Sequence, residues 1–463
     1  MTHQKTNRTT GSFGAIMWND FRGFLSYLEE KRELVRIKKE VDPKFEVAAY
    51  IRKSCDVSGP AFLFEKVKGF DGWRYGAALY ASRRRVAMGM GCENDQQVLD
   101  RYRVAVENPI EPKVVGDGPC QEVVMKDDAI DLRKIPIATH SARDSGPFIT
   151  SAVEIAKHPD TGVRLLGIHR LEVRGKAELA FWGPPEKRIG RAFLRSHDLG
   201  KPLDIAVVLG NEPAVDLASQ AKVPHDIDKM AIAGGIKKEP IALVRCKTVD
   251  LEVPRGAEVV IEGKIMPNTM KLEGPFGEMT GVYSGTTMSP SIKVTAITMR
   301  RQPIMHTVLA GVAPSENSNM VIPAMLEAIY RMAKQACPEV REVNVTGNSY
   351  FTALISIKKR HEGEAWNVIS TVLGGIYQTK YCYVFDEDIN IFEPSDVQWA
   401  VETRLQPHKD VHIFPVMVGA PLDPSAPLTR HTSKMGYNCT IPMGADRNKF
   451  QKVNVPGSDQ VTW

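Results

Sequence analysis

The most informative short stretch is Glu273-Gly-Pro-Phe-Gly-Glu278, in which two carboxylates flank a turn. Gly274, Pro275 and Gly277 favour a tight turn, which can bring both carboxyl groups into one small volume. Two neighbouring carboxylates repel each other, so one of them tends to hold a proton near neutral pH, which is the state that a general acid needs. Acidic residues that flank a turn can also be simply solvated, so the motif alone leaves both interpretations open.

Arg170 is the second candidate. It lies in residues 163–173, which are predicted to form one strand, and a period of two places it on the same face as Leu166 and Ile168. An arginine on an apolar face is usually paired or holds an anion, because an unpaired buried charge is costly. Its planar fork suits a substrate carboxylate. If the strand is instead an edge strand, Arg170 lies in solvent.

Other clusters are weaker. The acidic run at 386–390 follows a predicted strand and could bind a metal, although carboxylates at this spacing are weak evidence. The basic, hydroxyl-rich run at 430–434 could bind phosphate or form a solvated loop. There is no GxGxxG after a strand, no Walker A motif and no GxSxG elbow. The histidines without zinc-like spacing are His169, His197, His225 and His306.

Bulk properties narrow the class of protein. At 463 residues, with 43% hydrophobic and 25% charged residues, the chain should form two or three globular domains. The formal net charge of +5 comes without a long run of like charge, so no nucleic-acid partner is indicated. Seven cysteines without a CxxC pair suggest reduced thiols and a cytoplasmic protein. No apolar run approaches the length of a membrane helix, and residues 1–18 are predicted to be a mobile polar tail.

Hydrophobic periodicity divides the remainder into three parts. Residues 19–118 are predicted to be a small α/β domain, whose first helix is capped by Asn19 or Asp20. Residues 119–318 are rich in strands, which suggests a barrel or sandwich, with helices near 186–198 and 226–236. The predicted strands of this part are 151–157, 163–173, 203–209, 241–247, 257–266, 291–299 and 303–310.

Residues 319–463 are predicted to be a second α/β domain. Helices are expected near 322–332, 363–372 and 395–404. Ser395 and Gln398 have the spacing of a capping box at the start of the last of these helices.

Taken in order, these segments resemble the UbiD family of prenylated-FMN-dependent decarboxylases. No single piece is decisive, but the ordered series spans almost the whole chain after the tail. The segments that carry the resemblance are 20–25, 33–37, 59–65, 167–170, 262–263, 273–278, 386–392, 421–424 and 433–436.

The resemblance implies an N-terminal α/β domain, a central split β-barrel similar to flavin-reductase-type FMN binders, and a C-terminal α/β domain used in oligomerisation. A homo-oligomer, dimer or hexamer, is therefore expected. The implied cofactor is prenylated FMN, supplied by a flavin prenyltransferase, and its modified flavin acts as the electron sink for loss of CO2.

The implied activity is non-oxidative decarboxylation of an aromatic, heteroaromatic or α,β-unsaturated carboxylic acid, or the reverse carboxylation, through a covalent flavin adduct. Arg170 would orient the carboxylate, Glu273 would hold Arg170, and Glu278 would deliver the proton after CO2 leaves. The residues expected beside the cofactor by the same resemblance are Ile168, His169, Arg170 and Lys434.

One departure concerns the metal. The family usually coordinates a divalent ion, typically Mn²⁺, through Asn, His and Glu side chains that bridge to the cofactor phosphate. Here Leu165 stands at the Asn position and Lys229 at the Glu position, while the His position falls near Lys187 and Arg188. Leucine has no ligand atom and a lysine ammonium has no free lone pair.

These substitutions suggest that Lys229, together with Arg188, replaces the metal and contacts the phosphate. A divalent cation beside a glutamate sums to about +1, which is the charge of one lysine. Alternatively, Lys229 is a solvated helix residue and the pocket binds flavin weakly or not at all.

Two other functions stay open. The chain could be a non-catalytic or partner-dependent subunit of a carboxylase complex that has lost the metal site. It could also be a flavin-reductase-like binding module. Retention of Arg170, Glu273 and Glu278 favours catalysis, because an idle subunit need not keep all three.

Overall fold

The computed structural model describes residues 16–346, 351–427, 430–457 and 460–461. The chain forms two compact units, and the boundary between them falls at Met325/Leu326, inside the long helix α8 (Glu316–Ala336). Among these described residues, none of the helices combines the length and the apolar character that a membrane span requires.

The first part of the larger unit is a four-stranded sheet with helices. The sheet has the order β1-β2-β3-β16, and the side chain of Asp20 caps α1 by accepting a hydrogen bond from the Gly23 amide at 2.8 Å, as predicted. The predicted strand 303–310 is short and pairs in parallel with β3. The elements are α1 (Phe21–Glu30), β1 (Leu34–Ile37), α2 (Glu46–Val57), β2 (Ala61–Phe64), β3 (Arg74–Ala77), α3 (Arg83–Gly89), α4 (Asp95–Glu107) and β16 (Ile304–His306).

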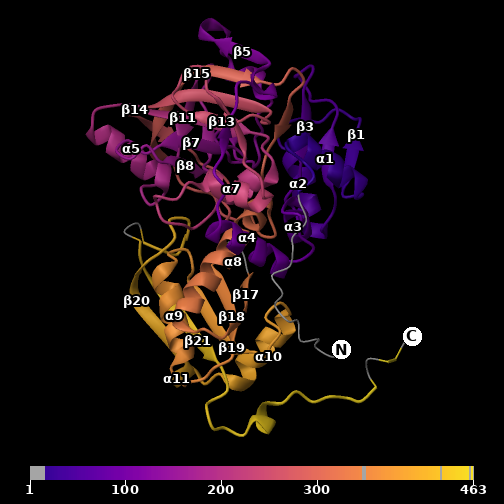
Figure 1. Ribbon diagram of the computed structural model, residues 1–463, viewed down its shortest axis with the longest axis vertical. Helices are drawn as coiled ribbons and strands as arrows, with labels where there is room; N and C mark the ends of the chain where they lie inside the picture. The colour runs from indigo at the N-terminus through magenta and orange to yellow at the C-terminus, as the bar shows by residue number, and fades with distance from the viewer. Residues whose placement is uncertain (1–15, 347–350, 428–429, 458–459, 462–463) are drawn as a thin grey trace. The chain divides into compact units, whose positions relative to one another are not determined.

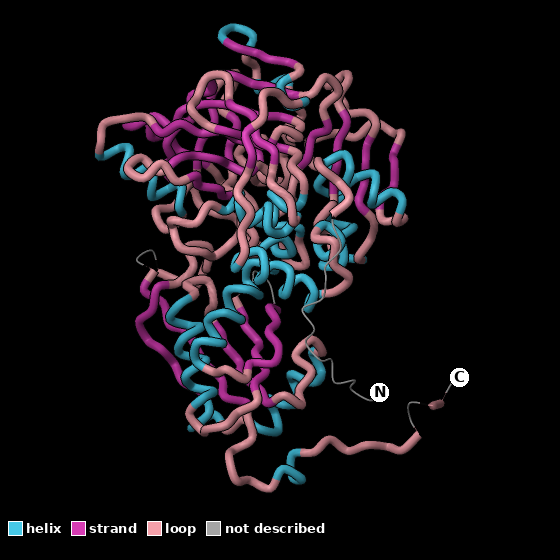
Figure 2. The backbone as a smooth tube through the Cα atoms, viewed as in Figure 1, coloured by secondary structure: helices cyan, strands magenta, loops and turns pink. Residues whose placement is uncertain are grey.

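The second part is a nine-stranded sheet that curls into a half-barrel, which confirms the expected mixed α/β and barrel class. The strand order is β6-β9-β10-β15-β14-β11-β7-β8, with β5 added beside β15. Figure 2 shows these strands crossing one another in projection, as a curled sheet should. They are β5 (Val123–Lys126), β6 (Phe148–Ile149), β7 (Val153–Lys157), β8 (Arg164–Gly167), β9 (Leu171–Val173), β10 (Glu178–Phe181), β11 (Leu203–Leu209), β14 (Val259–Glu273) and β15 (Thr287–Met299).

The connection from β8 to β9 forces the sheet to curl. These two strands lie toward opposite ends of the strand order, yet only Ile168, His169 and Arg170 separate them. So short a link spans at most about 14 Å, so the two edges must approach each other. The prediction of one continuous strand over 163–173 is therefore wrong, because the chain leaves the edge strand β8 at Gly167 and joins β9, which lies next to the opposite edge, at Leu171. His169 and Arg170 lie at this seam.

Two helices pack on the barrel near the seam (Figure 1). Helix α5 contacts β8, β11 and β14, and α7 contacts β8, α4 and α6, close to the predicted helical segments. A small sheet of order β13-β12-β4 lies in the same unit. These elements are β4 (Lys113–Val114), α5 (Arg188–Asp198), α6 (Pro213–Ala218), α7 (Lys229–Lys237), β12 (Ala242–Arg245) and β13 (Glu252–Pro254), with 3₁₀ turns η1 (Pro119–Gln121), η2 (Asp127–Ala129) and η3 (Leu132–Lys134).

The smaller unit is a five-stranded sheet of order β17-β18-β19-β21-β20. The inner strands β18, β19 and β21 are parallel, while β17 and β20 pair antiparallel at the two edges. Helix α9 packs on β19 and β21. The elements are β17 (Val340–Thr346), β18 (Thr352–Ile357), α9 (Glu364–Gly375), β19 (Tyr381–Asp386), α10 (Pro394–Arg404), α11 (Pro407–Asp410), β20 (Val411–Val418), β21 (His431–Cys439) and the 3₁₀ turn η4 (Arg447–Phe450).

Two local predictions for this unit are wrong. Helix α10 has Glu393 at its N-cap position, without a side-chain capping hydrogen bond, and Pro394 in its first turn, so Ser395 is not the N-cap residue. The run 430–434 is not a loop, because β21 begins at His431. Along a strand the side chains alternate, so Thr432 and Lys434 are buried while His431 and Ser433 are exposed, and the run does not gather on one face as a phosphate site.

The acidic run after β19 serves an internal ion pair. Asp388 receives two hydrogen bonds from Arg404, at 2.9 and 2.6 Å, and Asp386 receives a third at 3.3 Å. Asp386 also accepts the Ile441 amide at 2.7 Å. These carboxylates are committed to a buried arginine, which argues against the metal site considered for this run.

Candidate active site

Arg170 lies between two glutamates in the interior of the larger unit. Its Nε and Nη2 donate to the two carboxylate oxygens of Glu273 at 2.7 and 2.8 Å, and its Nη1 contacts Glu278. Only 7% of Arg170, 0% of Glu273 and 7% of Glu278 is exposed. The three residues predicted to act together therefore do lie together, in one buried ion network.

The Glu273–Glu278 turn is held by backbone contacts. Glu273 ends β14, and Gly274 follows in a left-handed conformation, φ +86°, which glycine adopts without strain. The Gly277 amide donates to Asp144 Oδ1 at 2.9 Å. A Cβ on Gly277 would lie 2.8 Å from Ser141 Oγ, so only glycine fits there without a shift. The turn thereby fixes Glu278 toward Arg170.

Two aromatic rings flank the guanidinium of Arg170. Its Cζ lies 4.6 Å from the centroid of the Trp182 ring and 5.5 Å from that of Phe276. Aromatic faces attract a cation and exclude water. Because the rings cover the faces of the guanidinium, a further carboxylate would approach along its edge. That edge already contacts Glu273 and Glu278.

His169 and Glu154 form a second buried pair beside the seam. Glu154 accepts the His169 amide at 3.0 Å and lies 3.0 Å from Nδ1 of its ring. Burial raises the pKa of Glu154 well above its usual range, so this carboxyl favours the neutral form. Burial, with Lys187 and Lys229 nearby, lowers the pKa of His169 to about 3. The histidine is therefore neutral, and its Nε2 is buried without a hydrogen-bond partner.

Positive charges gather where α5 and α7 begin. Lys187 precedes α5 and Arg188 opens it, Lys229 opens α7, and Lys222 lies in the loop between α6 and α7. Lys229 is 7% exposed and its ammonium donates to the Ser219 carbonyl at 2.6 Å. Burial, and then the other three cations, lower the pKa of Lys229 well below its usual range.

The remaining predicted residues fall in different places. Ile168 is half-buried against the core, and Leu165 is fully inside it. Lys434 lies in the smaller unit, where its ammonium donates to the carbonyls of Leu373 and Ile376 at 2.7 and 2.9 Å. Its part in a cofactor site stays a prediction.

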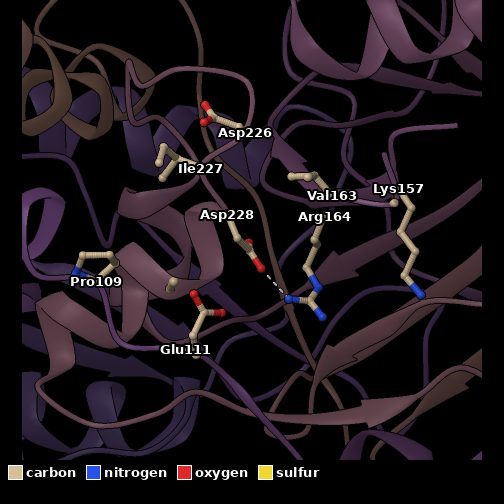
Figure 3. Close-up of a pocket in the computed structure, with 10 residues that line it drawn as sticks. Pro109, Glu111, Lys157, Val163, Arg164, Asp226, Ile227 and Asp228 are labelled. Atoms are coloured by element: carbon tan, nitrogen blue, oxygen red, sulfur yellow. Dashed lines mark hydrogen bonds and ion pairs between the residues drawn. The ribbon is translucent and has the colours of Figure 1, made fainter. Parts of the chain in front are cut away.

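A separate cavity of about 310 Å³ lies beside the start of α7 (Figure 3). Its cations are matched by acids, because Arg164 donates to Asp228 at 2.5 Å and to Glu252 at 2.9 Å. Lys157 also reaches Glu252, at 3.3 Å. This balance makes the cavity a poor anion site, unlike the cluster of four cations.

Three domain models of one family match this sequence. They are the N-terminal, Rift-related and C-terminal domains of 3-octaprenyl-4-hydroxybenzoate carboxy-lyase, at residues 25–102, 113–313 and 319–439. The chain belongs to the UbiD family. Its UbiD relatives include an uncharacterized protein of Archaeoglobus fulgidus, which is 33% identical over 451 residues and 92% of each chain.

Solved UbiD-class structures share the fold. The enzyme HmfF from Pelotomaculum thermopropionicum, in complex with FMN, is 39% identical, with a TM-score of 0.89 over 96% of this chain and 99% of that one. An evolved dimeric form of HmfF was solved with prFMN. The vanillic acid decarboxylase of Sedimentibacter hydroxybenzoicus, in closed form, is 29% identical, with a TM-score of 0.88 over 96% of this chain and 98% of that one. One structure of that decarboxylase contains a truncated ShVdcD component.

The UbiD metal does not fit the residues present. Within residues 16–346, 351–427, 430–457 and 460–461, no three His, Cys, Asp or Glu side chains group as a metal site would require. The nearest ligand types, Glu154 and His169, are bonded to each other, and the cations around them would repel a divalent ion. A flavin does fit, because a cluster of half-buried and buried cations near the unpartnered ring nitrogen of His169 suits an anionic cofactor.

Several site residues were not found from the sequence. Glu154, Lys222, Trp182 and Asp144 lack a motif of their own. Of these four, only Glu154 could have been noticed in the sequence, because a carboxylate inside a strand buried on both faces is unusual.

Proposed function

We propose that this chain is a decarboxylase of aromatic, heteroaromatic or α,β-unsaturated carboxylic acids, working with prenylated FMN, and that it can also run the carboxylation. The observation that carries the proposal is the buried Arg170 network, in which one guanidinium holds Glu273 with two hydrogen bonds and also contacts Glu278. The UbiD fold and the FMN-bound neighbour support it.

The roles of Glu273 and Glu278 follow from their contacts with Arg170. Glu273 is fully buried and fills one side of the guanidinium, so it serves to position Arg170. Glu278 meets only Nη1, which leaves it free to exchange with an incoming acid. A substrate carboxylate would take the place of Glu278 at Arg170, because an arginine fork recognises carboxylates well.

The exchange of Glu278 for the substrate carboxylate at Arg170 determines the protonation state of Glu278. Once the substrate carboxylate binds Arg170, two carboxylates face each other and their repulsion favours protonated Glu278. Prenylated FMN, when bound, supplies an electron sink for the bond to the carboxyl carbon. As that bond breaks and CO2 leaves, Glu278 gives its proton to the carbon that lost the carboxyl group. In carboxylation, Glu278 removes the proton from the same carbon.

The test is coexpression of the chain with a flavin prenyltransferase, followed by anaerobic purification. A flavin-like absorbance is expected, together with CO2 release from at least one acid in a panel of hydroxybenzoic, furoic and cinnamic acids. Exchange of the acid's carboxyl group with ¹³C-bicarbonate gives a second readout that does not need net turnover. Flavin-loaded protein that catalyses neither reaction with any acid contradicts the proposal.

A partner-dependent subunit is the second candidate. It is favoured by Leu165 and Lys229, which stand where the family has metal ligands, and by the second component in the structure of the vanillic acid decarboxylase. The two functions differ in one experiment. The subunit would bind flavin alone but exchange ¹³C-bicarbonate only after a second protein is added, whereas the decarboxylase acts as the purified chain.

A further inference from the structure

Four cations on three separate segments lie around one buried position. Lys187 and Arg188 stand at the start of α5, Lys222 follows α6, and Lys229 opens α7. Both helices pack on β8, which leads directly into the seam at His169. Burial, together with Lys187, lowers the pKa of Lys222 to about 7, so these groups are close enough to repel one another.

Three cations of the cluster form no ion pair in the described residues, although acids lie near two of them. In the described part of the chain, Lys187, Arg188 and Lys229 form no ion pair with a carboxylate, while the buried Lys237 pairs with Glu212 at 3.0 Å. Glu154 and Glu186 attract Lys187, and Asp228 and Asp226 attract Arg188, but burial raises the pKa of Glu154 well above its usual range. Lys229 is a buried positive charge without an ion-pair partner among the described residues, and such a charge is costly, so an anion from outside would stabilise it.

Unused donors mark where the anion binds. Nε and Nη1 of Arg188 are buried without a hydrogen-bond partner, although its Nη2 donates to the Ile227 carbonyl at 2.9 Å. The N-cap residue Lys187 gives α5 no side-chain cap, so the amides of the first turn have no acceptor from that side chain. Gly190, in that turn, lies so close to the Gly183 and Pro184 carbonyls that a Cβ there would clash with both.

We propose that Lys187, Arg188, Lys222 and Lys229 bind the phosphate of the flavin directly, and that this chain holds its cofactor without a divalent metal. The inference rests on the proposed flavin dependence. The ligand group is a phosphate monoester, whose charge of about −1.5 to −2 is opposite to that of the four cations. Leu165 and Lys229, which stand where the family has Asn and Glu ligands, fit a site that has exchanged a metal for ammonium groups.

The experiment uses the purified full chain, titrated with FMN or riboflavin and followed by quenching of flavin fluorescence. Each titration is done in EDTA and again with MnCl₂. FMN should bind in EDTA with a Kd that changes by less than about twofold when Mn²⁺ is added. Riboflavin, which lacks the phosphate, should bind at least about tenfold more weakly, and inorganic phosphate should compete with FMN but not with riboflavin.

Variants separate binding from folding. Lys229→Met should raise the Kd for FMN at least about tenfold, leave that for riboflavin unchanged, and leave the apo protein as stable as wild type or more so, because it removes an unpaired buried charge. Lys229→Arg keeps the charge and should retain most of the FMN affinity. The matched control is Lys201→Met, an exposed lysine just after α5, which should bind FMN as wild type does.

Three results would overturn the inference: a Kd for FMN that falls tenfold or more with Mn²⁺, an FMN affinity unchanged by Lys229→Met, or no flavin binding by wild type under either condition. Metal-free FMN binding without carboxyl exchange would count against the proposed decarboxylase alone. The two proposals therefore fail separately.

Discussion

The larger unit holds buried positive charge in two opposite ways. At the seam, Arg170 is neutralised by Glu273 and Glu278, and every atom of the network is placed by the protein itself. At the starts of α5 and α7, the cations repel one another, and the described residues give Lys187, Arg188 and Lys229 no carboxylate partner. The first region is balanced without a ligand, whereas we propose that the second is balanced only when it binds one.

This difference teaches how to assign roles. A balanced buried network holds its residues in place before a substrate arrives, so they suit positioning and proton transfer. An unbalanced cluster has a free energy that a ligand of opposite charge can lower, so it suits binding. Substitutions in the two regions should therefore change different observables, and often with opposite sign.

The largest effect is expected at Glu278. Glu278→Gln keeps the shape and the contact to Arg170 but removes the exchangeable proton, so kcat should fall by about 10²- to 10⁴-fold while the Kd for FMN stays the same. Steady-state CO2 release and flavin fluorescence measure the two quantities. Glu178→Gln, at a barrel carboxylate bound by Lys271, is the control and should keep wild-type turnover. Turnover of Glu278→Gln within threefold of wild type would refute the assigned role.

Arg170→Met tests the balanced region by unbalancing it. Glu273 would remain fully buried without its partner, which should lower the free energy of unfolding by about 3 kcal/mol in urea titrations. The double variant Arg170→Met/Glu273→Met removes both charges and should recover most of that loss. Lys229→Met should change the stability of the apo protein in the opposite direction. The comparison between the regions fails if both single variants destabilise the protein equally.

A pH titration tests the cationic cluster through Lys222. Lys222 has its pKa lowered to about 7 in the folded protein, whereas an exposed lysine has a pKa of 10.5. Between these values the unfolded state binds more protons, so stability should rise with pH, by up to ~1.4 kcal/mol per pH unit from this group. Below pH 7 the group is charged in both states, and the cost of burying its charge is present in full.

The readout is the stability of apo wild type minus that of Lys222→Met, measured by urea denaturation from pH 6 to 9. This difference should rise above pH 7 in the apo protein and flatten when FMN is bound, because the phosphate favours the charged lysine. FMN binding at pH 8 should accordingly take up protons, seen by calorimetry in two buffers of different ionisation enthalpy. A flat difference in the apo protein would show that burial and Lys187 do not lower the pKa of Lys222.

Part of this contrast could be predicted from short stretches of the sequence. The Gly-Pro-Phe-Gly spacer predicted the turn that aims Glu278, and the helices at 186–198 and 226–236 placed Lys187 and Lys229 near helix starts. These features depend on neighbours a few residues away. They survive in a single-sequence analysis because backbone preferences at glycine, proline and helix caps are local.

What the sequence could not provide depends on long-range pairing. The break at Ile168–Arg170 follows from strands that lie toward opposite ends of a curled sheet, and period two alone predicts one unbroken strand there. The partner of His169 is Glu154, fifteen residues earlier on β7, and only the β7–β8 pairing brings them together. Lys222 joins the cluster through the packing of α6 and α7, which no spacing rule encodes.

The smallest predicted effect concerns the turn that connects the balanced network to the backbone. Gly277→Ala places a Cβ 2.8 Å from Ser141 Oγ, which forces Ser141 or the turn to shift. A shift of Glu278 by a few tenths of an ångström should lower kcat several-fold, while a stability loss of about 1 kcal/mol is typical of such overpacking. Adding Ser141→Gly removes the obstructing side chain and should restore both quantities, whereas FMN affinity should not change in either variant. If Gly277→Ala weakens FMN binding as much as it slows turnover, the two regions are coupled through this turn, and the separation of positioning from binding is lost.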